Sequence, residues 1–252
     1  MIELKNITFS YEGREQGGLR NINLTVKNGE CILLCGRSGC GKTTITRLVN
    51  GLIPRFYAGE LTGQVLIDGK DIADLTMYKI AEKVGSVFQN PRTQFFNTDS
   101  DSEIAFGLEN QGMPTEELRQ RVETTAADLE IQSLRNRSLH ALSGGEKQKL
   151  ALARALYKGA PVVVLDEPTA ALDAIAESKL YNDFDKLTGG KTAVYISHRL
   201  SSTQFCNNVA MFKDGEMCEY GTHDSLMKKN GAYAEMFRLQ AQYYVDKEAA
   251  NV

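Results

Sequence analysis

The stretch "GRSGCGKT", Gly36 to Thr43, constrains the fold of this 252-residue chain more than any other feature. It fits the pattern G-x-x-x-x-G-K-[ST], follows the apolar segment "CILLC" and opens the helical segment "GKTTITRLVNGL". Glycines let the backbone wrap closely around a polyphosphate with its N–H groups pointing inward, and the start of a helix adds positive potential. The stretch therefore predicts a strand, a phosphate-binding loop and a helix, in that order.

Two residues of this loop have chemical roles beyond the backbone. Lys42 is expected to reach the β- and γ-phosphates of a nucleotide, and the hydroxyl of Thr43 is expected to be a ligand of Mg²⁺. The other expected nucleotide contacts are the remaining loop residues, namely Gly36, Arg37, Ser38, Gly39, Cys40, Gly41 and Thr44. The alternative, a glycine-rich turn with a solvated lysine, requires a chance match on the order of one in a hundred before the flanking strand and helix are considered.

The second chemical segment is "PVVVLDEPTAALD", in which a buried apolar strand ends at Asp166. A carboxylate in this place lies at the edge of a parallel sheet where ligands bind, so Asp166 is a candidate partner for Mg²⁺ through water. Glu167 points elsewhere and suits orientation or deprotonation of an attacking water. Taken alone, the same two acids could form a helix-capping cluster.

The whole chain predicts an α/β fold with a mostly parallel core sheet. Apolar strands alternate with helical segments, and a continuous run such as "VVVL" belongs in a sheet covered on both faces. Strand patterns vanish between about residues 90 and 142, which predicts a helical subdomain inserted into a single domain that occupies residues 1–252. Five scattered cysteines without CxxC spacing predict reduced thiols.

Charge and hydropathy exclude several function classes. The net charge of -3 lacks the excess of positive charge that is typical of nucleic-acid-binding proteins, so no nucleic-acid partner is expected. The longest apolar runs are far shorter than the roughly 18 residues that span a bilayer, and the N-terminus has no signal-peptide pattern. We therefore expect a cytoplasmic protein that reaches any membrane through a partner.

The third segment is "LSGGEKQKLALARAL", where Ser143, Gly144 and Gly145 precede a helix. The N-terminus of this helix is a second place where an anion could bind. Taken in isolation, however, the segment is better interpreted as a serine N-cap. A phosphate loop, then "LSGGE", then a strand ending in "DE" about twenty residues later has the order of the ATP-binding-cassette (ABC) ATPases. The sequence resembles that family from end to end.

The resemblance implies a P-loop NTPase fold with an N-terminal antiparallel β part, a helical subdomain, and ATP with Mg²⁺ as cofactors. Tyr11 matches the aromatic residue that stacks on adenine. Gln89 matches the glutamine that approaches magnesium and starts the loop toward the helical subdomain and the membrane partner. "LSGGE" matches the signature that binds the γ-phosphate of ATP held by the opposite subunit. Asp173 matches the loop that joins the two sites across the dimer, and His198 matches the switch histidine. The catalytic set is thus Glu167, His198, Gln89 and Lys42.

The resemblance also implies partners. Two chains, identical or different, would pair head to tail, and a separate membrane-spanning protein would hold them at the cytoplasmic face of the membrane. Up to the signature the sequence is similar to ATPases of energy-coupling-factor importers, and after it to nucleotide-binding domains of exporters. Phe95 and Phe96 are expected to face the membrane partner, although an aromatic pair in a loop is equally often part of the buried core. The alternative function is a soluble ABC ATPase of DNA repair, chromosome organisation or translation.

Overall fold

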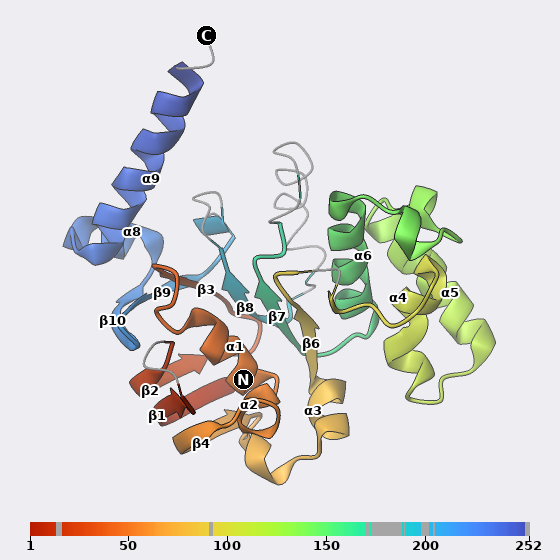
Figure 1. Cartoon of the computed structure of the whole chain (residues 1–252), viewed down its shortest axis with the longest axis horizontal. Helices are drawn as coiled ribbons and strands as arrows, with labels where there is room; N and C mark the ends of the chain where they lie inside the picture. Colours follow the sequence, from red (N-terminus) through yellow and green to blue (C-terminus); the bar gives the residue numbers. More distant parts are fainter. Residues whose placement is uncertain are drawn as a thin grey trace.

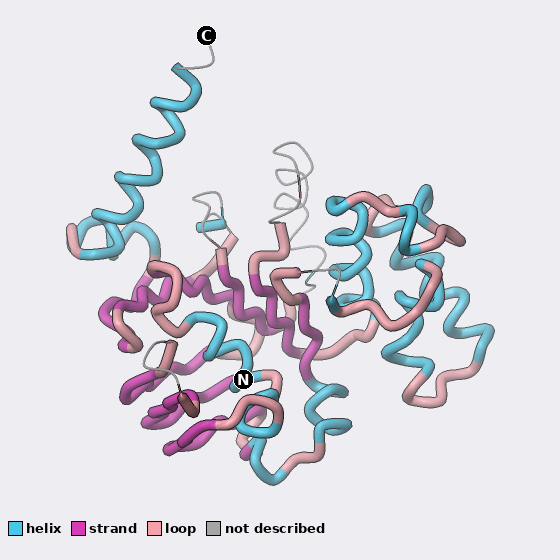
Figure 2. Tube along the Cα trace, viewed as in Figure 1, coloured by secondary structure: helices cyan, strands magenta, loops and turns pink. Residues whose placement is uncertain are grey.

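A computed structural model gives the fold (Figure 1). It describes residues 1–13, 17–90, 93–169, 172, 188, 190–197, 202–203 and 205–249, with side chains as far as residue 242. Asp173 and His198, predicted as site residues, lie outside the described residues. Two sheets and a group of helices make up the described part of the chain (Figure 2).

The first sheet is antiparallel and has the strand order β2-β1-β4-β5. Its strands are β1 (Ile2–Tyr11), β2 (Leu19–Val26), β4 (Gly59–Ile67) and β5 (Lys70–Asp71). Along β2 the apolar Ile22, Leu24 and Val26 are buried at alternate positions, so this strand buries one face. The sheet packs by that face against the second sheet and the helix after the phosphate loop.

The second sheet is the core of the molecule, with the order β10-β9-β3-β8-β7-β6. Its strands are β3 (Cys31–Gly36), β6 (Val84–Val87), β7 (Val162–Asp166), β8 (Thr192–Ile196), β9 (Asn208–Lys213) and β10 (Glu216–Gly221). The strands pair in parallel except β10, which runs antiparallel to β9. Every residue of β3, β7 and β8 is buried, which is the pattern of strands covered on both faces.

The two faces of the core sheet have different covers. Ile32 and Leu34 of β3 pack with the N-terminal sheet and α1 (Lys42–Val49), whereas Leu33 packs with α6 (Gly144–Tyr157) and Tyr233 on the other side. Tyr233 belongs to α9 (Ala232–Ala249), which follows α8 (His223–Lys229) and extends away from the body (Figure 1). On the first side lie also α2 (Leu52–Arg55), the 3₁₀ turn η1 (Ile72–Asp74) and α3 (Met77–Lys83).

Between β6 and β7 the regular elements of the described residues are all helices, apart from one isolated β-bridge between Asp99 and Ser138. They are α4 (Ser100–Glu109), α5 (Thr115–Asp128), the 3₁₀ turns η3 (Gln132–Leu134) and η4 (Leu139–Ala141), and α6. Their side chains form a separate apolar cluster, and α6 takes part both in this cluster and in the core of the sheet. The predicted fold class is confirmed, with an antiparallel N-terminal sheet, a mostly parallel core and a helical subdomain.

Candidate active site

The phosphate loop lies between β3 and α1, at the carboxyl edge of the core sheet. Gly36 and Gly41 have φ angles of 138° and 106°, which disfavour any residue with a Cβ atom. A Cβ on Gly36 would lie 2.3 Å from the main-chain oxygen of Phe212, and one on Gly41 would lie 2.6 Å from Leu19. The glycines therefore let the loop pass close to β9 and the N-terminal sheet.

The side chain of Lys42 is held in this loop. Its Nζ atom donates hydrogen bonds to the main-chain oxygens of Gly36 and Arg37, at 2.8 and 2.9 Å, and the residue is only 6% exposed. Cys40 is buried in the core cluster, so its expected contact with a nucleotide would involve its main chain. Arg37, Ser38 and Gly39 are exposed on the outer side of the loop.

Asp166 lies at the end of β7, next to the start of α1. It is 5% exposed, and burial raises the pKa of its carboxyl group above the ordinary value, while a hydrogen bond with Thr43 and the charges of Arg47 and Lys42 act in the opposite direction. Glu167, the adjacent acid, also raises this pKa. The structure thus brings together the hydroxyl and the carboxylate that the sequence predicts as the Mg²⁺ partners. Oxygen donors of these two kinds suit Mg²⁺.

Glu167 follows with an unusual backbone conformation. Its φ angle is 49°, and its N–H donates to the main-chain oxygen of Ile196 on the neighbouring strand at 3.0 Å. Its carboxylate accepts a hydrogen bond from Nε2 of Gln89 at 2.9 Å. Gln89 comes two residues after β6, so the ends of two neighbouring strands place these predicted catalytic residues in contact. The neighbouring pair Thr43 and Asp166 lies at the same edge of the sheet.

Ser143 and its glycines lie at the start of α6. The Ser143 hydroxyl accepts from the N–H of Glu146, and the Glu146 carboxylate accepts from the N–H of Ser143 at 2.7 Å, which together form a capping box. Arg137 adds a 3.0 Å ion pair to Glu146. Hydrogen bonds from the Ser143 main chain, and then from its side chain, lower the pKa of Glu146. The N-cap interpretation therefore holds for this chain, and the cap fixes the predicted signature residues to α6.

Tyr11 connects the N-terminal sheet to α1. Its hydroxyl lies 3.1 Å from the hydroxyl of Thr44 and accepts a hydrogen bond from Arg47 at 2.9 Å. Arg47 also lies over the ring of Tyr57, 4.1 Å from its centroid. Thr44 donates to the main-chain oxygen of Gly17 at 2.7 Å. The sequence singled out Tyr11 and Thr44 but missed Arg47 and Tyr57. Their only signal is an arginine one turn after Thr43 and the second residue of an aromatic pair in a loop.

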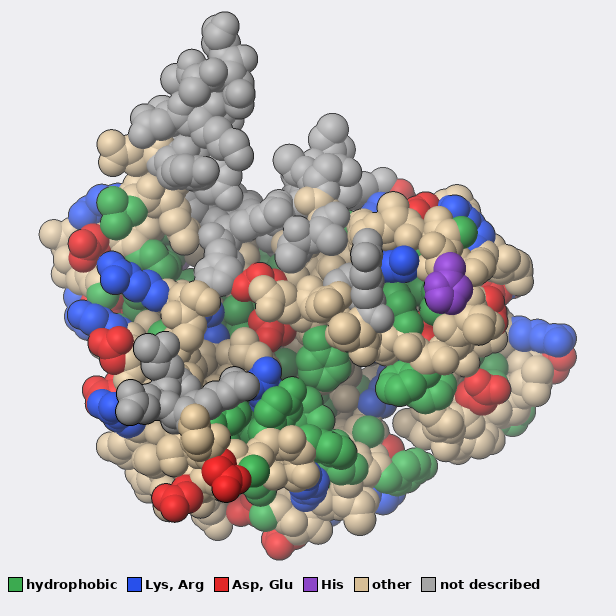
Figure 3. All heavy atoms as spheres, in the orientation of Figure 1, with side chains coloured by type: hydrophobic (Ala, Val, Ile, Leu, Met, Phe, Trp, Pro, Cys, Tyr) green, Lys and Arg blue, Asp and Glu red, His purple; other side chains and the backbone are tan. Residues whose placement is uncertain are grey.

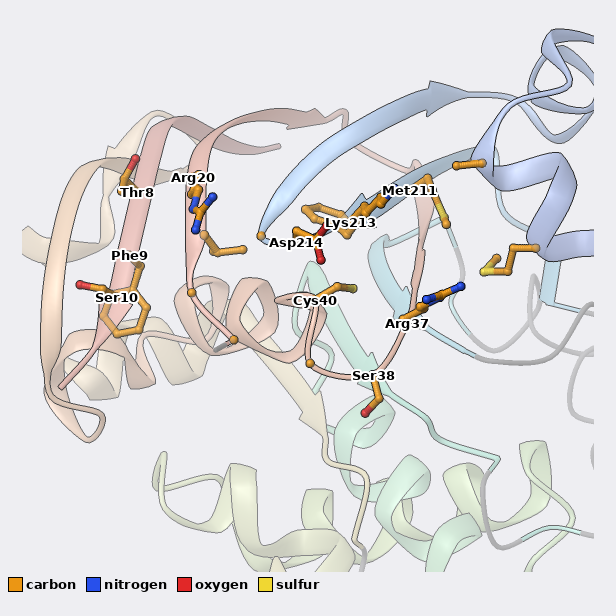
Figure 4. Close-up of a pocket in the computed structure, with 18 of the residues that line it drawn as sticks. Thr8, Phe9, Ser10, Arg20, Arg37, Ser38, Cys40, Met211, Lys213 and Asp214 are labelled. Carbon is orange, nitrogen blue, oxygen red and sulfur yellow. The ribbon is translucent and has the colours of Figure 1, made fainter. Parts of the chain in front are cut away.

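A cavity of about 720 Å³ opens beside the loop (Figure 4). It lies between β1, the outer side of the phosphate loop, the β9–β10 turn and α9, and its cationic side chains are Arg20, Arg37 and Lys213. Arg37 and Ser38 border it, whereas Lys42, Thr43 and Asp166 do not. Because loop residues line this cavity, it offers space next to the loop for a part of a ligand that the loop does not itself contact.

Two polar side chains behind the site were not predicted. Gln148 of α6 donates from Nε2 to the main-chain oxygen of Glu167 at 3.4 Å. Arg154 of α6 forms a 2.6 Å ion pair with the fully buried Glu103 and bonds to Gln94, so it ties α6 to the segment after Gln89. Both residues stand in an otherwise helical pattern, and no local signal separates them from solvent-facing positions.

Phe95 and Phe96 lie in different environments. Phe95 is partly buried between the core and the helical cluster, with Arg154 above its ring, which agrees with the alternative of a core position, and its contact with a partner stays a prediction. Phe96 is 75% exposed and stacks on Phe106, with ring centroids 5.2 Å apart. The two neighbours point apart because one fills the space next to α6 and the other lies over α4.

Comparisons with known proteins identify the same family that the sequence motifs indicate. The family model described as ABC transporter matches residues 19–170. A putative ABC transporter ATP-binding protein of Treponema denticola is 51% identical over 202 residues, which cover 79% of this chain and 41% of that protein. The chain spans between 39% and 45% of the length of the first curated relatives that it matches.

Three solved structures are similar over most of this chain. CbiO1 from Clostridium perfringens, part of the ABC transporter complex CbiONQ, has a TM-score of 0.79 and 28% identity, with 91% of each chain covered. A bacterial Atm1-family ABC exporter with ATP bound has a TM-score of 0.82 and 31% identity, with 95% of this chain and 41% of that chain covered. The dimeric ATP-binding cassette MJ0796, bound to ADP and Pi, has a TM-score of 0.78 and 30% identity, with 88% of this chain and 98% of that chain covered.

Proposed function

Because the chain belongs to the ABC transporter family, we propose that it binds and hydrolyses ATP and that this supplies energy for transport through a separate membrane-spanning protein. The observation that carries the proposal is the meeting of three groups at one edge of the core sheet. These groups are the loop with Lys42, the contact between Thr43 and Asp166, and the contact between Gln89 and Glu167. The relatives reported above are transporter proteins, which favours transport over the soluble alternatives.

Each group has a part in the proposed reaction. The loop N–H groups and Lys42 would hold the β- and γ-phosphates, and Thr43 with Asp166 would hold Mg²⁺, which neutralises charge on the phosphates when bound. Glu167 would accept a proton from the attacking water, while Gln89 keeps its carboxylate in place. Released phosphate and ADP would then separate from the loop.

A second chain would complete each site. Ser143, Gly144 and Gly145 lie on α6, in the helical subdomain, and would bind the γ-phosphate of ATP held by the partner's loop. The dimeric cassette MJ0796 supports this arrangement, as does the frequency of two-fold symmetry among oligomers. Asp173 is proposed to join the two sites, and His198 to act as the switch histidine. The two copies would be identical or related.

The membrane partner would contact the recess between the body and the helical subdomain, at the cytoplasmic face of the membrane. Hydrophobic side chains gather around this recess (Figure 3), and Phe88 and Phe96 are among the exposed aromatic residues after β6. Among the described residues, each helix is too short or too polar to span a bilayer. The similarity to CbiO1 supports an importer-type partner, whereas the similarity to the Atm1-family protein supports an exporter-type partner. The co-purification experiment below distinguishes the two types.

Phosphate release by the purified full chain tests the proposal. We expect hydrolysis of ATP that requires Mg²⁺ and stops when the metal is chelated. In parallel, the chain should co-purify with a membrane protein from detergent-solubilised membranes. Absence of hydrolysis would contradict the ATPase assignment, and hydrolysis without any membrane partner would favour a soluble ABC ATPase.

A further inference from the structure

Gln148 is a buried polar residue in the first turns of α6. The residue is 1% exposed, and its Nε2 atom donates to the main-chain oxygen of Glu167 at 3.4 Å. The other end of the same amide, Oε1, has no hydrogen-bond partner among the residues that the structure describes. The side chain therefore makes one hydrogen bond and leaves a buried acceptor without one.

A buried acceptor without a partner lowers the stability of a fold, because its hydration in the unfolded chain is not replaced. An apolar side chain of the same length would fill the space next to β7 and avoid this cost. Each such group in a native structure therefore calls for an explanation. Here the explanation lies at the other end of the amide, where Nε2 meets the main chain of Glu167.

Glu167 is held at all three of its polar groups. Ile196 accepts from its N–H at 3.0 Å, Gln148 donates to its carbonyl, and Gln89 donates to its carboxylate at 2.9 Å. Its φ angle of 49° lies in the left-handed region, which a residue with a side chain keeps only where the surroundings determine it. Without the bond from Gln148, the peptide after Glu167 can rotate, and the carboxylate then moves away from Gln89.

We propose that Gln148 is a positioning residue, which holds the main chain of Glu167 so that the carboxylate is aimed at the attacking water. This rests on the proposed function of Glu167 in ATP hydrolysis. The helix that carries Gln148 begins at the cap residue Ser143, in the segment proposed to meet the partner's ATP. Ser143 and Gln148 are five residues apart on this one helix, which thus joins that segment to the turn of the general base.

The test is Gln148→Met in the full chain, with Gln120→Met as the matched control. Methionine has a similar length and no polar side-chain nitrogen or oxygen, and Gln120 is exposed on α5. We expect kcat for ATP hydrolysis to fall by about 10- to 100-fold, as for a displaced catalytic group. KM should stay within about twofold of the unmodified value, since the phosphate loop is unchanged. The melting temperature should be equal or higher, because the unpartnered acceptor is removed.

A purely structural role gives a different result, in which kcat and the melting temperature fall together. That result, or unchanged kcat in Gln148→Met, overturns the inference. A second measurement adds Gln148→Met to Glu167→Gln, where we expect no further fall in hydrolysis because both changes act on one group. A further fall by the same factor as in the unmodified background means that Gln148 acts independently, and overturns it. If the unmodified chain hydrolyses no ATP, the proposed function itself fails and this inference with it.

Discussion

At the scale of single residues, the side chains of the site are held in place by hydrogen bonds within the chain itself. Lys42 is directed into its own loop by two carbonyl oxygens, and Gln89 holds the carboxylate of Glu167. The residues in these contacts come from three segments far apart in the sequence, which the parallel sheet brings to one edge. Groups fixed in this way need little rearrangement when substrate binds, which favours catalysis.

Lys42→Ala should weaken ATP binding by about 10- to 100-fold, the range for lost charge-assisted hydrogen bonds. The fold should survive, since the hydrogen bonds that the described structure gives to this side chain lie within the loop at a sheet edge. Equilibrium binding of ATP measures the effect, and thermal unfolding serves as the control. An affinity within twofold of the unmodified protein would contradict the role of Lys42.

At the scale of elements, α6 is the connection between the core sheet and the helical subdomain. Its apolar side chains enter both clusters, and Arg154 bonds to Glu103 of α4 and to Gln94. Glu103 is fully buried and also accepts from the N–H groups of Phe96 and Asn97. A buried charge is tolerated when it is paired and hydrogen-bonded in this way.

Lys158, the C-cap of α6, should limit stability near neutral pH. Burial, with a smaller effect of Arg154, lowers its pKa to about 8, although its Nζ donates to the main-chain oxygen of Val84 at 3.1 Å. The folded protein therefore binds fewer protons than the unfolded chain between about pH 8 and the ordinary lysine pKa, so its stability rises across that window. Lys158→Met should raise the free energy of unfolding by about 1 kcal/mol at pH 7, with a smaller gain at pH 10.

Denaturant unfolding at both pH values measures this difference. Lys70, an exposed lysine of β5, provides the control, since Lys70→Met should change stability by less than about 0.5 kcal/mol at either pH. A loss of stability in Lys158→Met at pH 7 would contradict the prediction. It would mean that the hydrogen bond to Val84 outweighs the burial of the charge.

Phe96→Ala tests the surface after β6. The ring is 75% exposed and its loss leaves the core intact, so basal ATP hydrolysis should stay within about twofold while co-purification with the membrane protein is lost. Leu239→Ala, which removes an exposed apolar side chain of α9, should leave co-purification unchanged. Equal retention of the membrane protein by both variants would place the partner's contact elsewhere.

At the scale of the whole molecule, the sequence predicted most of the fold because its strands and helices carry strong local patterns. The continuous apolar run in β7 and the motif between β3 and α1 are examples. The seven-residue α3 was missed, since Met77 and Ile80 are too few for a clear helical period. The environments of Phe95 and Gln148 were not predictable either, because they depend on which helix packs beside them rather than on neighbouring residues.

The proposed dimer gives the prediction at this scale. Glu167→Gln keeps the shape of the side chain but removes the proton acceptor, so hydrolysis should fall by about 10²-fold or more while ATP still binds. With ATP retained at both sites, the variant should elute from a sizing column as a dimer only when ATP is present. Lys42→Ala under the same conditions should elute as a monomer. A monomeric Glu167→Gln variant with full hydrolysis would contradict both the role and the dimer.

The left-handed glycines of the phosphate loop have a consequence for the speed of binding. Gly36 and Gly41 hold the loop against β9 and the N-terminal sheet, so its conformational entropy is lost during folding and not when ATP arrives. A nucleotide therefore meets a cradle that is already shaped, and its association rate should depend on diffusion and charge rather than on ordering of the loop. The rate of turnover would then be limited by later steps, namely the association and dissociation of the two chains.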